Sequence, residues 1–399
     1  AVSADVELLR RVQPLVPCHT FFFLVLTFEH KMLPFMLMSN DLTECNRDGY
    51  GSMSNLFRAS VFLAQKFNLT YVHHPLRCSH GVDWRVLDRW FDYGHGAPCD
   101  AACIDSAVAS GGLREASHFF GCRDGATRCR VGSRRHTYRN LELSELDVRA
   151  GRNTTQARDV LAFGAIVARE RARVAATGQG VVLRVGGCPR RYLVDAPVRE
   201  WLQTRYEGAR RRAGAVLAYE PRSVNLAIHY RSGDVKVRSD GSLAVVYDER
   251  LKRLQTGPAF YAAAVRQVVA WTRLPPSRVS VWLLTEGLID TDEHVRDSNL
   301  LLAAFTTAIP GLNLKLGNMT TLPSDLDHLA QADVLLTANS GLSLVAASLA
   351  RGVIVSQKDQ TYIAASLAGL KYGGTICARD GVCEQAGFLR AWGAFIADV

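Results

Sequence analysis

Apolar and polar positions follow two different periods along this chain, and the change of period predicts where strands give way to helices. Short continuous apolar runs, such as Val224–Ile228 and Val353–Ser356, are typical of parallel strands buried on both faces. Stretches with apolar residues at every third or fourth position, such as Phe260–Trp271, predict amphipathic helices. Because the two kinds of segment alternate, we expect right-handed β-α-β units and an α/β fold.

The alternation is clearest in the second half of the chain. There we expect strands at Val224–Ile228, Val279–Leu284, Leu312–Leu316, Val334–Thr337 and Val353–Ser356. We expect helices between them at Phe260–Trp271, Asn299–Ile309, Ser324–Ala330 (capped by Ser324) and Ser340–Leu349. Earlier in the chain we expect helices at Asn55–Phe67 (capped by Ser52 or Ser54), Ala157–Ala176 and Arg199–Ala213, and strands at Leu69–His73 and Gly178–Gly187.

A chain of 399 residues is long for one hydrophobic core and predicts two domains. We expect an N-terminal α/β domain over residues 45–215 and a Rossmann-like domain over 216–376. Residues 75–155 show weak periodicity and are interpreted as long loops and short helices. Residues 1–44 are left as an uncertain N-terminal segment, and 377–399 as a C-terminal tail.

The net charge of +9 raises the question of a nucleic-acid or anionic membrane partner. The sequence contains no zinc-finger spacing and no Lys/Arg-rich block with interleaved aromatics. We therefore expect no nucleic-acid partner, and interpret Arg205 and residues 210–212 as a solvated helix surface. A basic nucleic-acid binder remains as a third-ranked alternative, which would show salt-sensitive binding to oligonucleotides.

The ten cysteines indicate disulfides. None of them forms a CxxC pair, although Cys99 and Cys103 with His80 and His95 leave a metal site open. Three Asn-x-Ser/Thr sequons accompany them, at Asn68, Asn153 and Asn318. Together these features favour the lumen of the secretory pathway, in the endoplasmic reticulum or the Golgi. Cys377 and Cys383 frame a turn-like segment that a local disulfide would close.

The beginning of the chain gives no targeting signal that can be read. Phe21–Phe28 and Met32–Met38 are apolar, but charged residues at 29–31 separate them, and the run is too short for a transmembrane span. A buried strand and a damaged anchor both fit it. Because the chain begins with Ala rather than Met, a signal or membrane anchor upstream stays open.

The segment with the most chemistry is His229–Asp234, which follows the predicted strand Val224–Ile228. Parallel strands of open α/β sheets bind ligands at their carboxyl ends. An arginine there, Arg231, offers a planar set of donors suited to a diphosphate. A surface loop in which Arg231 and Asp234 pair with each other is the alternative.

These residues also resemble a known family. His229–Asp234 (HYRSGD) resembles the HxRxxD-type motif of the fucosyltransferase superfamily, the α1,6-/α1,2-fucosyltransferases and protein O-fucosyltransferases that use GDP-fucose. Asp325–Ala350 is similar to the nucleotide-site segment of the α1,6-fucosyltransferases, and Cys45–Val72 to the Gly-rich loop, helix and strand near the family's N-terminus. The three matches occur in the family's order. The resemblance implies a GT-B-like fold, in which two Rossmann-like domains face a cleft.

The resemblance also implies roles for single residues around Arg231. Arg231 would contact the β-phosphate of GDP-fucose, and His229 would lie against the nucleotide. Asp234 would hold the loop or Arg231. The family's second arginine falls on Ser232, which is a departure. Asp240 is the candidate general base for an inverting transfer, although it lies one position out of the family's register.

Further donor contacts would come from three other segments. Asp325 aligns with the acid that recognises guanine, and a helix-start Asp is its alternative. Ser340, Gly341 and Ser343 would open a helix whose N-terminal amides cradle the diphosphate. Glu286 stands where the family has an Asp. On the N-terminal side the family's Gly-rich loop matches Gly49, Tyr50 and Gly51, and the helix after it carries Asn55 and Arg58, which could reach the cleft.

The predicted activity is inverting transfer of fucose from GDP-fucose to a glycan or protein hydroxyl, without a cofactor. The motifs Asp290-Thr291-Asp292 and Asp325-Leu326-Asp327 fit a metal-binding DxD pattern, but helix starts favour Asp in any case. We therefore expect arginine rather than a metal to stabilise the leaving diphosphate. The alternatives are another nucleotide sugar as donor, and a catalytically idle glycan- or nucleotide-binding protein on the same fold.

Overall fold

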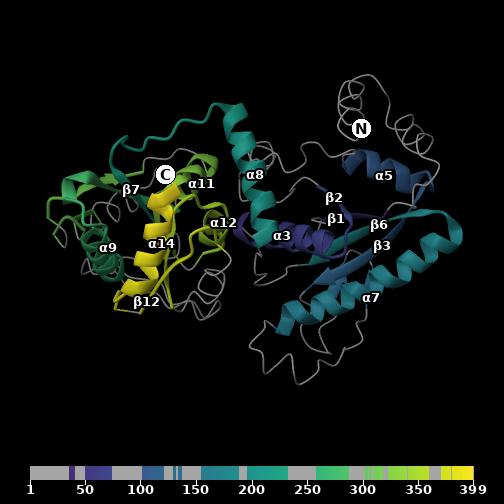
Figure 1. Cartoon of the computed structure of the whole chain (residues 1–399). Coiled ribbons are helices and arrows are strands. Elements are labelled where there is room, and N and C mark those ends of the chain that lie inside the picture. Colours follow the sequence, from purple (N-terminus) through teal and green to yellow (C-terminus); the bar gives the residue numbers. More distant parts are fainter. Residues whose placement is uncertain are drawn as a thin grey trace. The chain divides into compact units, whose positions relative to one another are not determined.

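The computed structural model of this chain describes residues 36–40, 50–73, 101–120, 129–131, 134–136, 154–187, 196–231, 258–286, 302–303, 305–307, 310–317, 322–338, 340–358, 370–378 and 380–398. They form two compact units, each built around its own parallel sheet (Figure 1). The α/β fold with two parallel sheets expected from the sequence is therefore confirmed. The division between the units falls inside helix α3 (Tyr50–Lys66), whose residues up to Arg58 belong to the second unit.

The first unit is a four-stranded parallel sheet with the strand order β2-β1-β6-β3. Its strands are β1 (Met36–Asn40), β2 (Thr70–Val72), β3 (Leu113–Phe120) and β6 (Gly180–Gly187). Helix α5 (Ala101–Ala109) packs on β3, and α7 (Thr154–Thr177) packs on β6. A separate antiparallel pair joins β4 (Cys129–Val131) to β5 (Arg134–His136).

The first unit contains elements that the sequence pattern did not predict. Strand β1 comes from the segment left uncertain, and α5 and β3 come from the stretch interpreted as loops and short helices. The sequence pattern did not reveal strand β3 because polar side chains lie on both of its faces. Arg114 pairs with the buried Glu170 of α7, and Glu115 accepts a hydrogen bond of 2.9 Å from Arg184 of β6. This double polar pairing removes the alternation that marks a strand.

The second unit is a six-stranded parallel sheet with the order β12-β11-β10-β7-β8-β9. Its strands are β7 (Val224–Arg231), β8 (Val279–Glu286), β9 (Asn313–Leu316), β10 (Val334–Leu336), β11 (Val353–Gln357) and β12 (Gly374–Cys377). The chain runs outward from β7 through β8 to β9, then returns to β10 on the other side and runs outward again. The sheet is therefore doubly wound, and its strand order reverses between β7 and β10.

The helices of this unit are α8 (Ala196–Ala213), α9 (Pro258–Thr272), α11 (Leu322–Gln331), α12 (Gly341–Leu349) and α14 (Gln385–Asp398), with a 3-10 turn at Pro276–Arg278. All five strands predicted in this half are confirmed in position, and β7 and β8 extend past their predicted ends. Of the predicted helix Asn299–Ile309, residues 302–303 and 305–307 are described, and they are helical. No helix in the described parts of the chain is long and apolar enough to cross a membrane.

One face of the second sheet carries a large hydrophobic core. Leu226, Ile228 and Tyr230 of β7 project from that face and pack with side chains of α9 and α14. Strand β7 is also buried on its other face, where Ala227 and His229 are less than 2% exposed. Burial on both faces explains why the strand reads as a continuous apolar run in the sequence.

The segment interpreted as a C-terminal tail is a helix of the core. Phe388, Trp392 and Phe395 of α14 are buried against the sheet, with the Phe388 and Trp392 rings stacked at 5.9 Å. Their spacing of three and four residues places them on one helix face. The prediction of a tail was wrong because this apolar face was not recognised after the cysteine pair.

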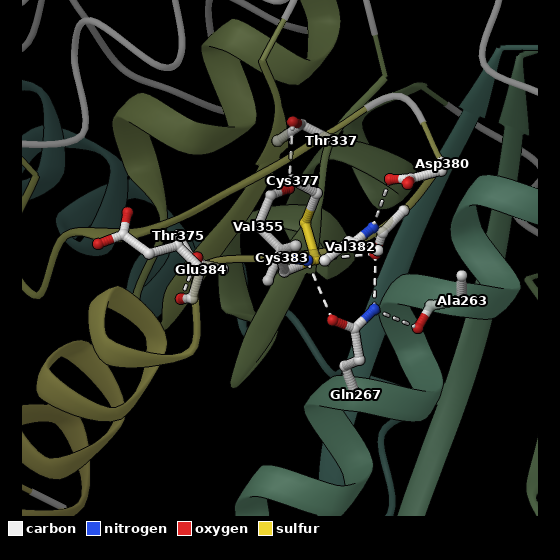
Figure 2. Close-up of a disulfide and its surroundings, with 11 residues drawn as sticks. Ala263, Gln267, Thr337, Val355, Thr375, Cys377, Asp380, Val382, Cys383 and Glu384 are labelled. Carbon is white, nitrogen blue, oxygen red and sulfur yellow. Dashed lines mark hydrogen bonds between the residues drawn. A yellow bond between two sulfur atoms is a disulfide. The ribbon is translucent and has the colours of Figure 1, made fainter.

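The predicted disulfide between Cys377 and Cys383 is present and joins the end of β12 to the start of α14 (Figure 2). Gln267 of α9 holds the loop that the disulfide closes. Its side chain donates to the Gly381 carbonyl at 2.6 Å. It also accepts from the Cys383 amide at 3.0 Å, as Figure 2 shows. The loop is therefore fixed both covalently and by a half-buried amide side chain.

At the amino ends of the strands, Glu220 gathers polar side chains from two neighbouring strands. Its carboxylate accepts hydrogen bonds from Ser280 of β8 at 2.8 Å, from Asn313 of β9 at 3.0 Å, and from Lys315 of β9. These bonds lower the pKa of Glu220 from 4.5 to about 2, and the bond from Lys315 has the largest effect.

We predict that this cluster makes stability depend on pH in the acid range. Because the pKa of Glu220 is lowered in the folded protein, its contribution is complete above pH 4.5 and is lost as the pH falls toward 2. In thermal melts between pH 6 and pH 2.5, Glu220→Gln should lose less stability on acidification than the wild type. Equal losses of stability in the two proteins would show that Glu220 does not cause this pH dependence.

Candidate functional site

The site lies where β7 and β10 part at the carboxyl edge of the second sheet. Their last register pair is Ile228 with Leu336, and beyond it the two strands are no longer hydrogen-bonded to each other. His229 follows on β7, and Thr337 and Ala338 follow β10. In doubly wound sheets a crevice opens where the strand order reverses, because the crossovers on the two sides lie on opposite faces.

Ser343 of α12 bridges the two diverging strands from one face. Its hydroxyl oxygen lies 2.5 Å from His229 Nδ1 and accepts a hydrogen bond of 2.8 Å from the Ala338 amide. The hydroxyl oxygen can accept a second hydrogen bond or donate its own proton, so Ser343 pairs with Nδ1 in either tautomer of His229. In both cases this contact fixes the orientation of the ring.

Tyr261 of α9 bridges the same strands from the other face. Its hydroxyl lies 3.3 Å from the His229 carbonyl and 3.5 Å from the Thr337 carbonyl. Tyr261 is 1% exposed, and a buried tyrosine hydroxyl requires such a partner. The sequence analysis did not single out Tyr261. Its only signal was a polar hydroxyl on the apolar face of a predicted helix.

The N-terminus of α12 lies directly after the divergence. Ser340 is its N-cap, in extended conformation, and its side chain accepts a hydrogen bond of 3.0 Å from the Leu342 amide. Gly341 is the first helical residue and adds no side chain to the first turn. Ser340, Gly341 and Ser343 thus lie at the start of a helix, with the positive end of the helix dipole at the sheet edge.

Arg231 is the last residue of β7, and Glu286 is the last residue of the neighbouring strand β8. They are register partners in the parallel pair, so their Cα atoms are neighbours across the ladder. The sequence analysis expected both residues in loops. The structure shows that β7 and β8 continue through them, which fixes their backbones.

Asp325 lies in the first turn of α11, and its neighbour in the DxD motif has a structural role. The Asp327 carboxylate is 1% exposed and accepts hydrogen bonds from the Tyr206 hydroxyl and from Arg210 Nε at 3.0 Å, both in α8. Burial raises the pKa of Asp327, and the bonds from α8 oppose this shift. Because these donors occupy Asp327, the DxD pair does not present two free carboxylates.

The Gly-rich segment of the match over Cys45–Val72 is partly helical. Tyr50 and Gly51 lie in the first turn of α3, and Gly49 is outside the described residues. Ser52 and Ser54 lie within the helix, so the prediction that one of them caps it was wrong. Likewise α11 begins at Leu322, and Ser324 lies inside its first turn rather than at the cap. Asn55 is also on α3.

Arg58 does not reach toward a ligand, as its helix position suggested. It is 2% exposed, and Nη1 donates to the Leu344 carbonyl at 3.3 Å and to Ser348 Oγ at 2.9 Å. Arg58 therefore ties α3 to α12 within the second unit. The helical spacing of the sequence predicted on which face of α3 Arg58 lies, but it did not predict that this face is buried.

Asp234 and Asp240, from the second half of the predicted motif, lie outside the described residues. The same holds for Asp290 and Asp292. Among the residues that the structure does describe, no group of three or more His, Cys, Asp or Glu side chains could hold a metal ion.

No protein-family model matches this chain, and no curated protein matches it. Its structure is similar to that of POFUT1 in complex with GDP-fucose, with 11% identity, a TM-score of 0.38, and coverage of 80% of this chain and 95% of that one. It is also similar to a mutant of Arabidopsis thaliana FUT1 in complex with GDP (15%, TM-score 0.39, coverage 88% and 77%). A third similarity is to the E. coli heptosyltransferase WaaC with ADP (11%, TM-score 0.31, coverage 91% and 97%).

We predict that Ser343→Ala releases His229. The change leaves the buried Ala338 amide and His229 Nδ1 without their shared partner, so we expect a loss of about 1–3 kcal/mol of stability. It should also change the NMR signals of the His229 ring, measured on protein with isotope-labelled histidine. Ser348→Ala, on the same helix but bonded to Arg58, is the matched control. Unchanged His229 ring signals in Ser343→Ala would contradict a role for Ser343 in holding the ring.

Proposed function

We propose that this chain is an inverting glycosyltransferase that transfers fucose from GDP-fucose to a hydroxyl of a glycan or protein. One observation carries the proposal. His229 and Arg231 of β7, Glu286 of β8 and the N-terminus of α12 come from three segments of the chain, and all lie at the carboxyl edge of the second sheet. The same residues carry the resemblance to the fucosyltransferase superfamily.

The donor would be held mainly through its diphosphate. Arg231, at the end of β7, would supply the positive charge that stabilises the departing GDP. The backbone amides at the start of α12 would donate to phosphate oxygens, and Gly341 lets a phosphate approach closely. His229, with its orientation fixed by Ser343, would lie against the nucleotide. Asp325 would accept from guanine N1–H and the 2-amino group.

The reaction is a displacement at the anomeric carbon of fucose. The acceptor oxygen forms a bond to that carbon as the bond to the GDP β-phosphate oxygen breaks, and the acceptor proton passes to a base. We propose Asp240 as that base and Asp234 as the residue that holds Arg231. No metal is needed in this scheme, because Arg231 and the helix amides supply the charge at the leaving group.

The sequons and the Cys377–Cys383 disulfide support a place in the secretory pathway, where glycan and glycoprotein acceptors occur. A catalytically idle protein that still binds GDP is the second candidate. The observation in its favour is Ser232, which stands where the family has a second arginine.

We predict that the purified protein releases GDP from GDP-fucose in the presence of EDTA, and that Arg231→Ala reduces this turnover at least about 100-fold. Arg266→Ala, which removes an exposed arginine of α9, should leave turnover unchanged. A panel of other nucleotide sugars identifies the donor. GDP binding without turnover, even with glycan and glycoprotein acceptors added, would favour the idle protein.

We also predict that Asp325 reads the guanine base. Wild-type protein should bind GDP about 10-fold or more tightly than inosine diphosphate, which lacks the 2-amino group, since a hydrogen bond to a carboxylate contributes about 1.5–3 kcal/mol. Asp325→Ala should remove this preference, measured by calorimetry, while Asp380→Ala, an exposed control, should keep it. A preference that survives in Asp325→Ala would exclude this role.

A further inference from the structure

His328 of α11 is a buried histidine to which neither the sequence analysis nor the proposed function assigns a role. It is 3% exposed, and both nitrogens of its ring have a partner. Nδ1 lies 2.8 Å from the Ser324 carbonyl, one turn earlier in α11, and Nε2 accepts a hydrogen bond of 2.9 Å from the Ala218 amide. The ring therefore joins α11 to the segment that connects α8 to β7.

The two hydrogen bonds together define the protonation state of the ring. A carbonyl oxygen can only accept, so Nδ1 carries a proton. A backbone amide can only donate, so Nε2 carries none. The neutral ring with its proton on Nδ1 is the form that satisfies both partners. A second proton, on Nε2, would leave the bond to Ser324 intact but would bring two donors, Nε2–H and the Ala218 N–H, face to face.

Residues 216–219, which His328 holds, have further backbone anchors at their two ends. Ala215, before them, donates from its amide to the last turn of α8 at 3.3 Å, and Glu220, after them, donates from its amide to the start of β7 at 3.0 Å. Between these ends, the hydrogen bonds to the described parts of the chain both go to His328. One is the bond to its ring, and the other runs from the Tyr219 hydroxyl to its carbonyl.

The same segment lies at the surface, so water can replace the bond to the ring. Val216 is 87% exposed, and Ala218 is exposed as well. A surface segment with few internal hydrogen bonds opens at a low free energy compared with unfolding of the whole unit. Loss of the bond to His328 is therefore expected to free residues 216–219 while the sheet and α11 stay folded.

The charged groups around His328 do not compensate a second proton on its ring. Asp327 attracts a charged ring, but its carboxylate already accepts hydrogen bonds from Tyr206 and Arg210 of α8. Burial is the largest cause that lowers the pKa of His328 from its ordinary value of 6.5, and repulsion by Arg210 adds to this shift. The bond to Ser324 and the attraction of Asp327 oppose the shift without cancelling it.

The aromatic rings packed on His328 carry no charge. The centroid of the Tyr219 ring lies 5.2 Å from that of His328, and the centroid of the Trp282 ring of β8 lies at 6.3 Å. Burial raises the pKa of Tyr219 well above 10, so its hydroxyl stays protonated at any pH at which His328 titrates. Neither ring therefore supplies a negative charge for a charged imidazole.

We propose that His328 is a pH-sensitive switch, which holds residues 216–219 on α11 when its ring is neutral and releases them when the ring is protonated. The proton binds Nε2, and the Ala218 amide exchanges its bond to the ring for a bond to water. Because the released ring takes up the proton more readily than the held one, acid favours the released form. The held form is favoured fully above pH 6.5, and the preference declines as the pH falls below that value.

The test is hydrogen–deuterium exchange of peptides covering residues 214–220, followed by mass spectrometry between pH 7.5 and pH 5 and corrected for the intrinsic pH dependence of exchange. In the wild type, protection should be constant above pH 7 and should fall by up to about tenfold for each pH unit below 6.5. His328→Gln has an amide that can donate to Ser324 and accept from Ala218 but does not titrate, so its protection should not change with pH. His328→Ala should be unprotected at every pH.

Two controls separate the switch from other effects of acid. His73→Gln, which removes a histidine of the first unit, should respond as the wild type does. Peptides from β7 and β10 should stay protected throughout, which excludes unfolding of the whole unit. The inference is overturned if wild-type protection of 214–220 is the same at pH 7.5 and pH 5, if His328→Gln loses protection in the same way, or if β7 and β10 open together with the segment. The measurement needs no ligand, so its result does not depend on the proposed donor site.

Discussion

The parting of β7 and β10 is the feature on which the second unit depends. Up to Ile228 and Leu336 the strands are joined by a regular ladder, and one residue later the ladder ends. Two hydroxyl groups span the opening from opposite faces of the sheet: Ser343 reaches the His229 ring and the Ala338 amide, and Tyr261 reaches the His229 and Thr337 carbonyls. Polar groups that the ladder no longer satisfies are therefore paired within the protein, and the strand ends are held in place before any ligand arrives.

The sequence predicted the second unit well because its strands are buried on both faces. A continuous apolar run is a strong signal, and β7, β8, β10 and β11 all lie where such runs occur. The first unit was predicted less completely. Its strand β3 carries Arg114 and Glu115 on opposite faces, each paired with a charge on another element. Pairings of that kind join residues far apart in sequence, and no local pattern reveals them.

The candidate site shows the same limit. The sequence predicted the helix that begins near Ser340 and contains Ser343, but it ended the strand at Ile228, and His229 lies within β7. It gave Asp327 no role beyond the DxD pattern, because the approach of Tyr206 and Arg210 from α8, which gives Asp327 its structural role, leaves no local signal. Arg58 was misjudged for the same reason: helical spacing shows which way a side chain points, and its burial depends on α12, which lies about 290 residues further along the chain.

The position of α14 also bears on how the protein is made. Phe388, Trp392 and Phe395 complete a core whose other members begin near residue 226. While the chain is being synthesised, the sheet face beneath α14 stays uncovered until translation has passed residue 395. During that interval a nascent chain exposes apolar strands, so this unit completes its folding late and passes through a stage that is prone to aggregation.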